Sequence, residues 1–168
     1  TAGFGGNNGG FGGLVVLSSG KIVVGGYMTN GNNEDFAVYR LTANGGMDNT
    51  FSVDGKVNIG FGAERDERAF DLVVQPDGKI VVVGYSCDQT QTCNFAVARL
   101  NSNGTLDTTF SGDGKQMTDL GGNDIGYALA LQSNGKIVVA GTRRISSDSN
   151  FALVRYNSNG SLDVTFGG

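Results

Sequence analysis

Carboxylates are the side chains of this sequence that could do chemistry, because its 168 residues include 16 Asp and Glu but no histidine. The lack of histidine excludes Ser-His-Asp and Cys-His catalysis and every histidine-ligated metal site. What remains is a pair of acids acting on a glycosidic bond, for which Asp66 or Glu67 could face Asp124. Nothing in the pattern selects these acids from the others. A glycoside-acting enzyme is therefore a remote alternative, and we expect the chain not to be an enzyme.

Three aspartates recur at equivalent places in a repeated sequence: Asp48, Asp107 and Asp163, with Asp54 and Asp113 shortly after the first two. Oxygen ligands suit Ca²⁺, so Asp107 and Asp113 are candidate ligands of a calcium site. An aspartate between two turns more often caps backbone N–H groups with its own side chain. A residue that determines a fold also recurs wherever the fold does. We therefore expect a structural role and no cofactor, with calcium as the alternative.

The two cysteines, Cys87 and Cys93, are separated by five residues, DQTQT. A loop of this length can bring two Cα atoms within disulfide distance, and no other Cys or His lies nearby to complete a metal site. We predict a disulfide, with two free thiols as the alternative. A disulfide places the protein in an oxidising compartment, so we expect an extracellular or cell-surface location.

Charge and hydropathy exclude two classes of partner. The formal net charge is −4 with only 12 Lys and Arg, so nothing attracts a phosphate backbone and nucleic acid is not expected as a partner. No apolar run approaches the roughly 18 residues that a membrane-spanning helix needs, so we expect no membrane insertion.

The elements that position these residues come from an internal repeat. One phrase occurs three times: SSGKIVVGG at 18–26, PDGKIVVVG at 76–84 and SNGKIVVAG at 133–141. The glycines Gly20, Gly78 and Gly135 superpose in steps of 58 and 57 residues, a spacing typical of propeller blades or solenoids. Other residues recur with the phrase: Phe36, Phe95 and Phe151; Arg40, Arg99 and Arg155; the Asn-Gly turns at 44–45, 103–104 and 159–160; and Phe51, Phe110 and Phe166.

Each copy has the pattern of four antiparallel strands. In the middle copy, residues 69–75 and 79–85 are rich in Val and Ile and flank Asp77-Gly78, which predicts a hairpin with a two-residue type I′ turn. Residues 94–100 alternate as a half-buried strand does, and 115–120 form a weaker fourth strand. Each repeated arginine ends a strand, and we expect it to pair with the following aspartate or with carbonyls. The fold class is therefore all-β, with three propeller-type blades.

The pattern DGKIVVVGY…NFAVARLNSNGTLDTTFSGDGK resembles the delta-60 repeat family, a β-propeller repeat of unknown function from large bacterial surface or secreted proteins. The likeness covers nearly the whole chain. The first copy departs from it by writing Gly45-Gly46-Met47-Asp48 where the others have Gly-[TS]-Leu-Asp. The resemblance implies a propeller-like fold and an extracellular setting. It implies no catalytic residues.

The order of the strands predicts how copies join. We divide the single domain 1–168 into repeats at about 11–68, 69–126 and 127–168, the last of which stops before its fourth strand. Residues 1–10 align with the missing strand, so we predict that the N-terminal strand completes the last blade and hides its edge. Three blades are few for a closed ring, so we expect this strand to come from another copy, giving a head-to-tail ring or filament. The alternative is a piece of a longer propeller.

A variable face offers the remaining candidate site. The loops at 28–35, 86–94 and 143–150 differ between copies, whereas the turns at the opposite ends of the strands are nearly identical. Loops freed from holding the fold are where binding is usually placed, and Arg65, Asp66, Arg143 and Arg144 are the candidate ligand-binding residues. The preferred interpretation is a non-catalytic structural, adhesive or assembly module. The alternative is a module that binds a surface glycan, a protein or another ligand, with or without calcium.

Overall fold

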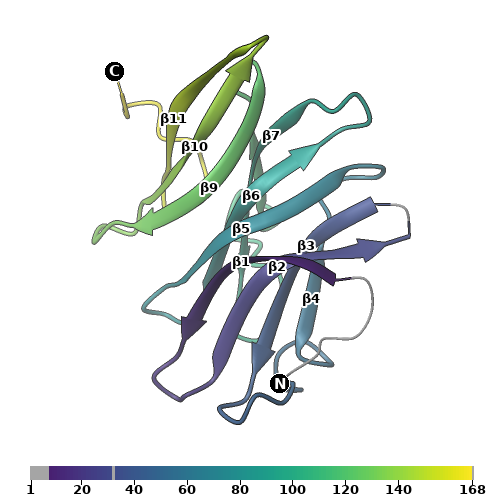
Figure 1. Ribbon diagram of the computed structural model, residues 1–168. Helices are drawn as coiled ribbons and strands as arrows, with labels where there is room; N and C mark the ends of the chain where they lie inside the picture. Colours follow the sequence, from purple (N-terminus) through teal and green to yellow (C-terminus); the bar gives the residue numbers. More distant parts are fainter. Residues whose placement is uncertain (1–7, 32, 168) are drawn as a thin grey trace.

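The computed structural model describes residues 8–31 and 33–167 (Figure 1). The secondary structure of these residues is strand, turn and loop, and they contain no helix that could cross a membrane. The strands are β1 (Asn8–Val16), β2 (Ile22–Asn30), β3 (Asn33–Leu41), β4 (Lys56–Ile59), β5 (Asp66–Val74), β6 (Ile80–Cys87), β7 (Cys93–Leu100), β8 (Lys115–Thr118), β9 (Asn123–Leu131), β10 (Ile137–Ile145) and β11 (Asp148–Tyr156).

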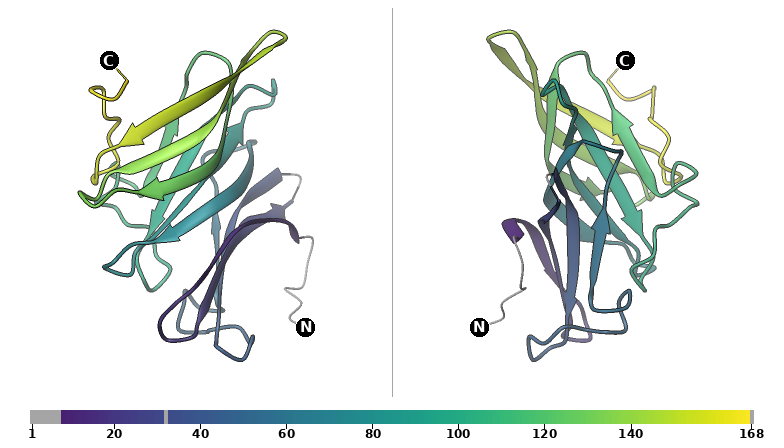
Figure 2. Two further views of the ribbon diagram at one scale, coloured as in Figure 1. Left: turned by 60° about the vertical axis from the view of Figure 1, so that its left-hand side comes forward. Right: turned by 90° about the vertical axis from the view of Figure 1, so that its right-hand side faces the viewer.

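The strands form three antiparallel sheets in the order of the chain. The first sheet is β1-β2-β3-β4, the second is β5-β6-β7-β8, and the third is β9-β10-β11. Figures 1 and 2 show the sheets side by side, with the second between the other two. The predicted all-β fold with propeller-like blades is confirmed. We call the sheets blades from here on.

The hairpin turns differ from the type I′ turns expected from the sequence. In the middle copy the Gly78 amide donates to the Gln75 carbonyl, and the Gln75 amide donates to the Lys79 carbonyl. Gly78 has a φ of +83°, but Asp77 is not among the residues with positive φ, whereas a type I′ turn needs positive φ at both central residues. The loop is therefore a three-residue turn closed by a left-handed glycine. Pro76 fits such a loop because proline favours the second position of a type I turn.

A glycine at the end of the repeated phrase is required by close backbone packing. A Cβ at Gly84 would lie 1.9 Å from the carbonyl oxygen of Arg68, and one at Gly141 would lie 2.0 Å from that of Ile125. Both glycines sit where the pairing of the first and second strands shifts by one residue. The bulge brings the two backbones too close for any side chain, which explains why the phrase ends in glycine in the second and third copies.

The core lies between the blades. β5 packs against β1, β2 and β3, and β9 packs against β5, β6 and β7. One apolar cluster joins the first two blades and includes Phe36 and Val82; a second joins the last two and includes Phe95 and Val139. The repeated side chains of β3 and β7 are therefore the ones that hold neighbouring blades together.

The N-terminal strand begins earlier than the repeat boundaries drawn from the sequence. Asn8 pairs with Met28 and Gly9 with Tyr27, so residues 8–10 belong to the first blade and the prediction that they complete the third blade is wrong. β1 spans the same positions as β5 and β9, but its glycine-rich sequence lacks the apolar alternation that marks a strand. The rest of the predicted donated strand, residues 1–7, lies outside the described residues. The third blade has three described strands.

Candidate functional site

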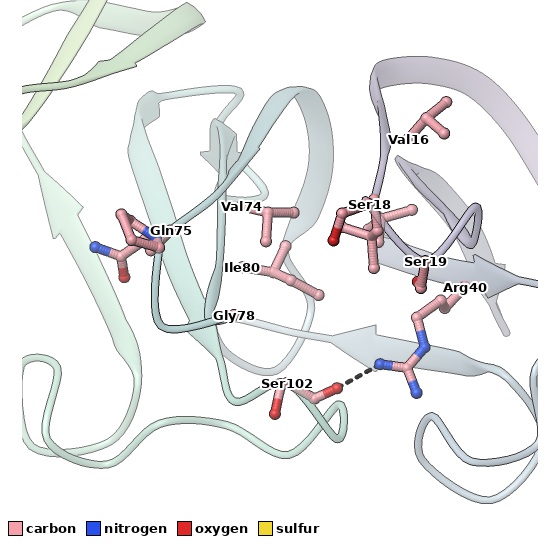
Figure 3. A pocket seen from close by; sticks show the side chains of 12 residues that line it. Val16, Ser18, Ser19, Arg40, Val74, Gln75, Gly78, Ile80 and Ser102 are labelled. Atoms are coloured by element: carbon pink, nitrogen blue, oxygen red, sulfur yellow. Dashed lines mark hydrogen bonds between the residues drawn. The ribbon is translucent and has the colours of Figure 1, made fainter.

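A cavity of about 420 Å³ lies between the hairpin turns of the first two blades (Figure 3). Val16 and Ser18 line one wall, Val74 and Ile80 line the other, and Arg40 reaches across its edge. The Arg40 guanidinium donates from Nη1 to the carbonyl of Ser102 in the second blade. Arg40 is therefore used in joining the blades.

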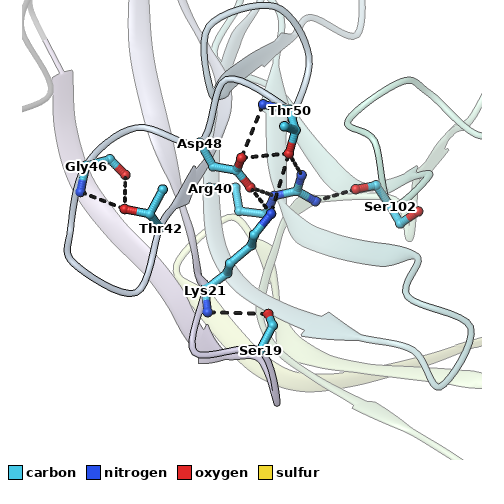
Figure 4. A network of polar contacts seen from close by, with 8 residues as sticks. All are labelled: Ser19, Lys21, Arg40, Thr42, Gly46, Asp48, Thr50 and Ser102. Atoms are coloured by element: carbon cyan, nitrogen blue, oxygen red, sulfur yellow. Dashed lines mark hydrogen bonds and ion pairs between the residues drawn. The ribbon is translucent and has the colours of Figure 1, made fainter.

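Each arginine is held in place by an aspartate of its own blade. In the first blade, Arg40 Nε donates to Asp48 Oδ2 at 2.7 Å, and Lys21 Nζ lies 2.8 Å from the same oxygen (Figure 4). Asp48 Oδ1 accepts from the hydroxyl of Thr50 at 2.6 Å and from its amide at 3.2 Å. The hydrogen bond from Lys21 is the largest cause that holds the Asp48 pKa well below its usual value, followed by those from Thr50.

The same cluster occurs in the other two blades. In the second blade, Asp107 Oδ2 lies 2.6 Å from Arg99 Nε and 2.9 Å from Lys79 Nζ. Burial raises the Asp107 pKa, but the hydrogen bonds from Lys79 and Thr109 more than offset it and leave the pKa well below its usual value. In the third blade, Asp163 Oδ2 lies 2.6 Å from Lys136 Nζ and 2.7 Å from Arg155 Nε.

These contacts also describe the calcium candidates. The carboxylate of Asp107 is already surrounded by a guanidinium, an ammonium and a threonine. Asp113 is exposed, and its Oδ1 caps the amide of Lys115 at 2.9 Å. The part of the chain that the structure describes contains no group of three or more Asp, Glu, Cys or His residues arranged to hold a metal.

A contact between neighbouring blades is built on the clusters of the first and second blades, and we call it the interblade latch. Its first half is an arginine stacked on a phenylalanine: Arg40 lies 4.7 Å from the centre of the Phe51 ring, and Arg99 lies 4.8 Å from that of Phe110. Its second half is the Asn-Gly turn of the following blade. These turns supply carbonyls to the arginines (Ser102 to Arg40, Ser158 to Arg99) and to backbone amides (Asn103 to Ser52, Asn159 to Ser111).

Each latch is tight at its glycine. A Cβ at Gly104 would lie 2.9 Å from the Ser52 amide nitrogen, and one at Gly160 would lie 2.8 Å from that of Ser111. The glycine of the turn is thus required both for its positive φ and for the close approach of the neighbouring blade.

The two ends of the stack each carry half a latch. In the third blade Arg155 stacks 4.5 Å from the centre of the Phe166 ring, but within the described ranges no carbonyl accepts from its outer guanidinium nitrogens. In the first blade, a Cβ at Gly45 would meet no atom within 4 Å. The surfaces are defined as follows: the tail face is Val138, Ala140, Phe151, Leu153 and the Arg155–Phe166 pair, and the head face is Leu14 and the turn 42–46.

The exposed fractions of equivalent side chains show that the tail face resembles one side of the contact between two blades, with no blade packed against it. Phe151 is 73% exposed, whereas Phe36 and Phe95 at the equivalent positions are 0% exposed. On the head face, Leu14 is 61% exposed, whereas its equivalent Leu72 is 4% exposed because it packs against the first blade. The tail face therefore presents to solvent the side chains that hold blades together internally. On the head side Leu14 is exposed, whereas Val24, Ala37 and Tyr39 form a small buried cluster.

The candidate binding residues fall in two separate places on the variable face. Arg65 donates to the hydroxyl and the carbonyl of Ser86, and Asp66 accepts from the Glu34 amide and lines a cavity of about 290 Å³. Arg144 lines a different cavity of about 530 Å³ with Asn123 and Tyr127, among others, and donates to the Ser146 carbonyl. The buried Nε of Arg143 has no hydrogen-bond partner. The structure does not bring these four residues into one site.

The predicted disulfide is formed: Cys87 and Cys93 are bonded and face each other as the last pair of the β6–β7 hairpin. The other acids considered for catalysis hold the connections between blades. Glu67 accepts from the Phe61 amide at 3.4 Å, and Asp124 accepts from the Leu120 amide at 2.6 Å. Burial is the main cause that raises the pKa of Asp124.

Glu67 is fully buried between the first two blades. Burial is the main cause that raises its pKa to about 7; the hydrogen bond from Ser86 lowers the pKa and the neighbouring Asp35 raises it. Because folded Glu67 holds its proton up to about pH 7 and unfolded glutamate releases it near pH 4.5, this residue lowers the free energy of unfolding as pH rises between the two values. The three cluster aspartates act the other way, since their depressed pKa values remove stability as pH falls below about 3.8.

We predict that Glu67→Gln abolishes the loss of stability above pH 5. The amide can still accept from Ser86 and can donate to Asp35, but it stays neutral. The expected gain at pH 8 is about 2–3 kcal/mol, with almost none at pH 4.5. Urea unfolding at a series of pH values measures it, with Glu64→Gln, an exposed position of the same connection, as the control. A parallel pH dependence for the wild type and Glu67→Gln would contradict the assignment.

Sequence reasoning found part of the latch and missed the rest. The pairing of each arginine with the following aspartate is confirmed. The lysine of the phrase GKIVV and the threonine two residues after each aspartate were not singled out, although both recur in all three copies. The carbonyls that accept from Arg40 and Arg99 belong to backbone, so no side-chain pattern reveals them.

Comparison with known proteins gives a family with repeats of the same extent. The model of a β-propeller domain of unknown function, DUF5122, matches residues 17–51, 75–110 and 132–166. Each match contains one complete cluster, from its lysine to the phenylalanine on which the arginine stacks. No curated protein matches the chain. Since the three matches cover more than half of the residues, this chain belongs to the DUF5122 β-propeller family.

Proposed function

We propose that this protein is a non-catalytic structural module that builds larger assemblies by joining head to tail with other copies of itself. The observation that carries this proposal is the exposure of Phe151 at a position whose equivalents, Phe36 and Phe95, are completely buried between blades. An apolar face of this kind on a protein surface marks an interaction site. Its neighbours Val138, Ala140 and Leu153 extend the same face.

The energy available at such a joint is considerable. Burying a phenylalanine or leucine side chain stabilises a contact by about 1.5–3 kcal/mol, and Phe151, Leu153 and Leu14 would all be covered. When the head face of one copy binds the tail face of another, each pair still has one free head and one free tail. Such a contact therefore continues into a closed ring or an open filament. Two chains of three blades each would supply six blades, a number common among propellers.

The disulfide supports an extracellular or cell-surface setting for this module, because such bonds persist in oxidising compartments. The absence of enzymatic activity is supported by the use of the buried acids: Glu67 and Asp124 hold backbone amides, and the cluster aspartates hold arginine and lysine.

The mass of the native protein tests the proposal. Light scattering after size exclusion, over a hundredfold range of chain concentration, should give a mass that is a multiple of the 17.4 kDa chain mass. For an open filament this mass should fall on dilution, whereas for a closed ring it should stay at one fixed multiple. A chain mass of 17.4 kDa at every concentration would overturn head-to-tail assembly.

A further inference from the structure

The two half-latches at the ends of the stack are complementary, and this inference rests on the proposed head-to-tail assembly. We infer that Arg155 and Phe166 of one copy receive the turn 42–46 of a second copy, forming a third latch like the two inside the chain. By equivalence with the internal latches, Arg155 donates to the Ala43 carbonyl and the Gly167 amide donates to the Asn44 carbonyl.

The tail half of this latch already has the required conformation. Ser52 and Ser111, whose amides donate to carbonyls of the incoming turns, both have a φ of +54°, and Gly167 at the equivalent position has a φ of +85°. Arg155 is held by Asp163 Oδ2 at 2.7 Å and stacks on Phe166, as Arg40 and Arg99 do on their own phenylalanines. No ordering of the backbone is needed before a turn can dock, which lowers the entropy cost of association.

The head half is preformed as well. Gly45 has a φ of +84°, against +92° for Gly104 and +88° for Gly160, the glycines of the two docked turns. The turn 42–46 is closed by the hydrogen bond from the Gly45 amide to the Thr42 carbonyl, as the docked turns are closed by theirs. Docking it would give Arg155 the carbonyl that Arg40 and Arg99 already have.

Charge also favours this pairing over a contact between like ends. A guanidinium donating to a backbone carbonyl is a charge-assisted hydrogen bond, stronger than one between neutral groups. A tail-to-tail contact would instead bring two Arg155 guanidiniums toward each other, and a head-to-head contact would leave both sets of carbonyls without donors. The latch therefore sets the polarity of the assembly.

Cross-linking between two variants that each carry one added cysteine tests the contact. Asn44→Cys is mixed with a larger, tagged Gly167→Cys chain and treated with a short bis-maleimide, which reacts with free thiols and leaves the Cys87–Cys93 bond intact. The amide and carbonyl at the equivalent internal positions are 2.6 and 2.8 Å apart, so a cross-linked pair with one chain of each kind is expected. Serine occupies positions equivalent to Gly167 in both internal latches, so cysteine fits its backbone.

The control pairs Asn44→Cys with Val53→Cys, an 88% exposed position that lies beside the latch between the first two blades and not on the tail face, and should give no cross-linked pair. Arg155→Lys keeps the charge beside Asp163 but loses the forked guanidinium, and should raise the dissociation constant of the assembly about tenfold. Arg144→Lys on the variable face should leave it unchanged.

The outcomes separate this inference from the proposed function. Cross-linking of the mixed pair together with the effect of Arg155→Lys supports the latch. An assembled protein that gives no Asn44–Gly167 cross-link and tolerates Arg155→Lys overturns the latch and leaves assembly standing. A protein that never assembles overturns both.

Discussion

Phe151→Asp should convert the assembled protein into folded single chains. Phe151 lies on the tail face and is 73% exposed, so the aspartate is solvated in the single chain and costs little stability. In the joint, the same carboxylate would be buried among apolar side chains without a partner, which is strongly unfavourable. Light scattering should show a mass of 17.4 kDa, with thermal unfolding of the single chain nearly unchanged.

The matched control for this change is Val53→Asp. Val53 is apolar and 88% exposed, and it belongs to neither the tail face nor the head face, although it follows Ser52 of the latch between the first two blades. It receives the same charge at a comparable exposure and should assemble as the wild type does. Equal loss of assembly in both variants would mean that added negative charge, and not the tail face, is responsible.

Phe95→Ala should lower the free energy of unfolding by about 3–5 kcal/mol. Phe95 is completely buried between the second and third blades, where its ring contacts the backbone of Gly141 closely enough that a Cβ there would lie 2.8 Å away. Removing the ring leaves a cavity that the paired strands cannot collapse to fill. Urea unfolding at a concentration where the chain is not assembled measures the loss.

Phe151→Ala is the internal comparison for this loss, because it makes the same change at the equivalent position of the next blade. Its expected cost in the single chain is below about 1 kcal/mol, since little burial is lost. If the two alanine variants were equally destabilised, Phe151 would be covered in the single chain and the tail face would not exist as described.

The repeat explains why the blades could be predicted from sequence. The Val and Ile runs of β2 and β6, punctuated by Asp-Gly or Ser-Gly, indicate hairpins by local pattern alone, and the disulfide followed from the spacing of its two cysteines. The turn type was wrong because Asp77 keeps a negative φ, which a dipeptide pattern cannot show. The start of β1 at Asn8 is not visible in the sequence, because Gly9 and Gly10 carry no apolar side chain to mark a strand.

The surfaces proposed for assembly could not be predicted residue by residue, and the reason is physical. Phe36, Phe95 and Phe151 stand in nearly identical sequence contexts, yet two are buried and one is exposed. The difference lies in whether another blade packs against the phenylalanine in the structure, which is a property of the stack and not of the local sequence. The candidates on the variable face failed to converge for a related reason. Asp66 and Arg144 belong to strands of different blades and line different cavities, and the linear sequence does not show how far apart they lie.

Complementation between two disabled chains tests head-to-tail joining most directly. Phe151→Asp removes the tail face and Leu14→Asp removes the head face, so each variant alone has no productive partner and should remain a single chain. Mixed in equal amounts, the intact head of the first should bind the intact tail of the second and stop at one chain of each, seen by native mass spectrometry with isotope-labelled partners. A mixture that stays as single chains, or either variant assembling on its own, would contradict the account.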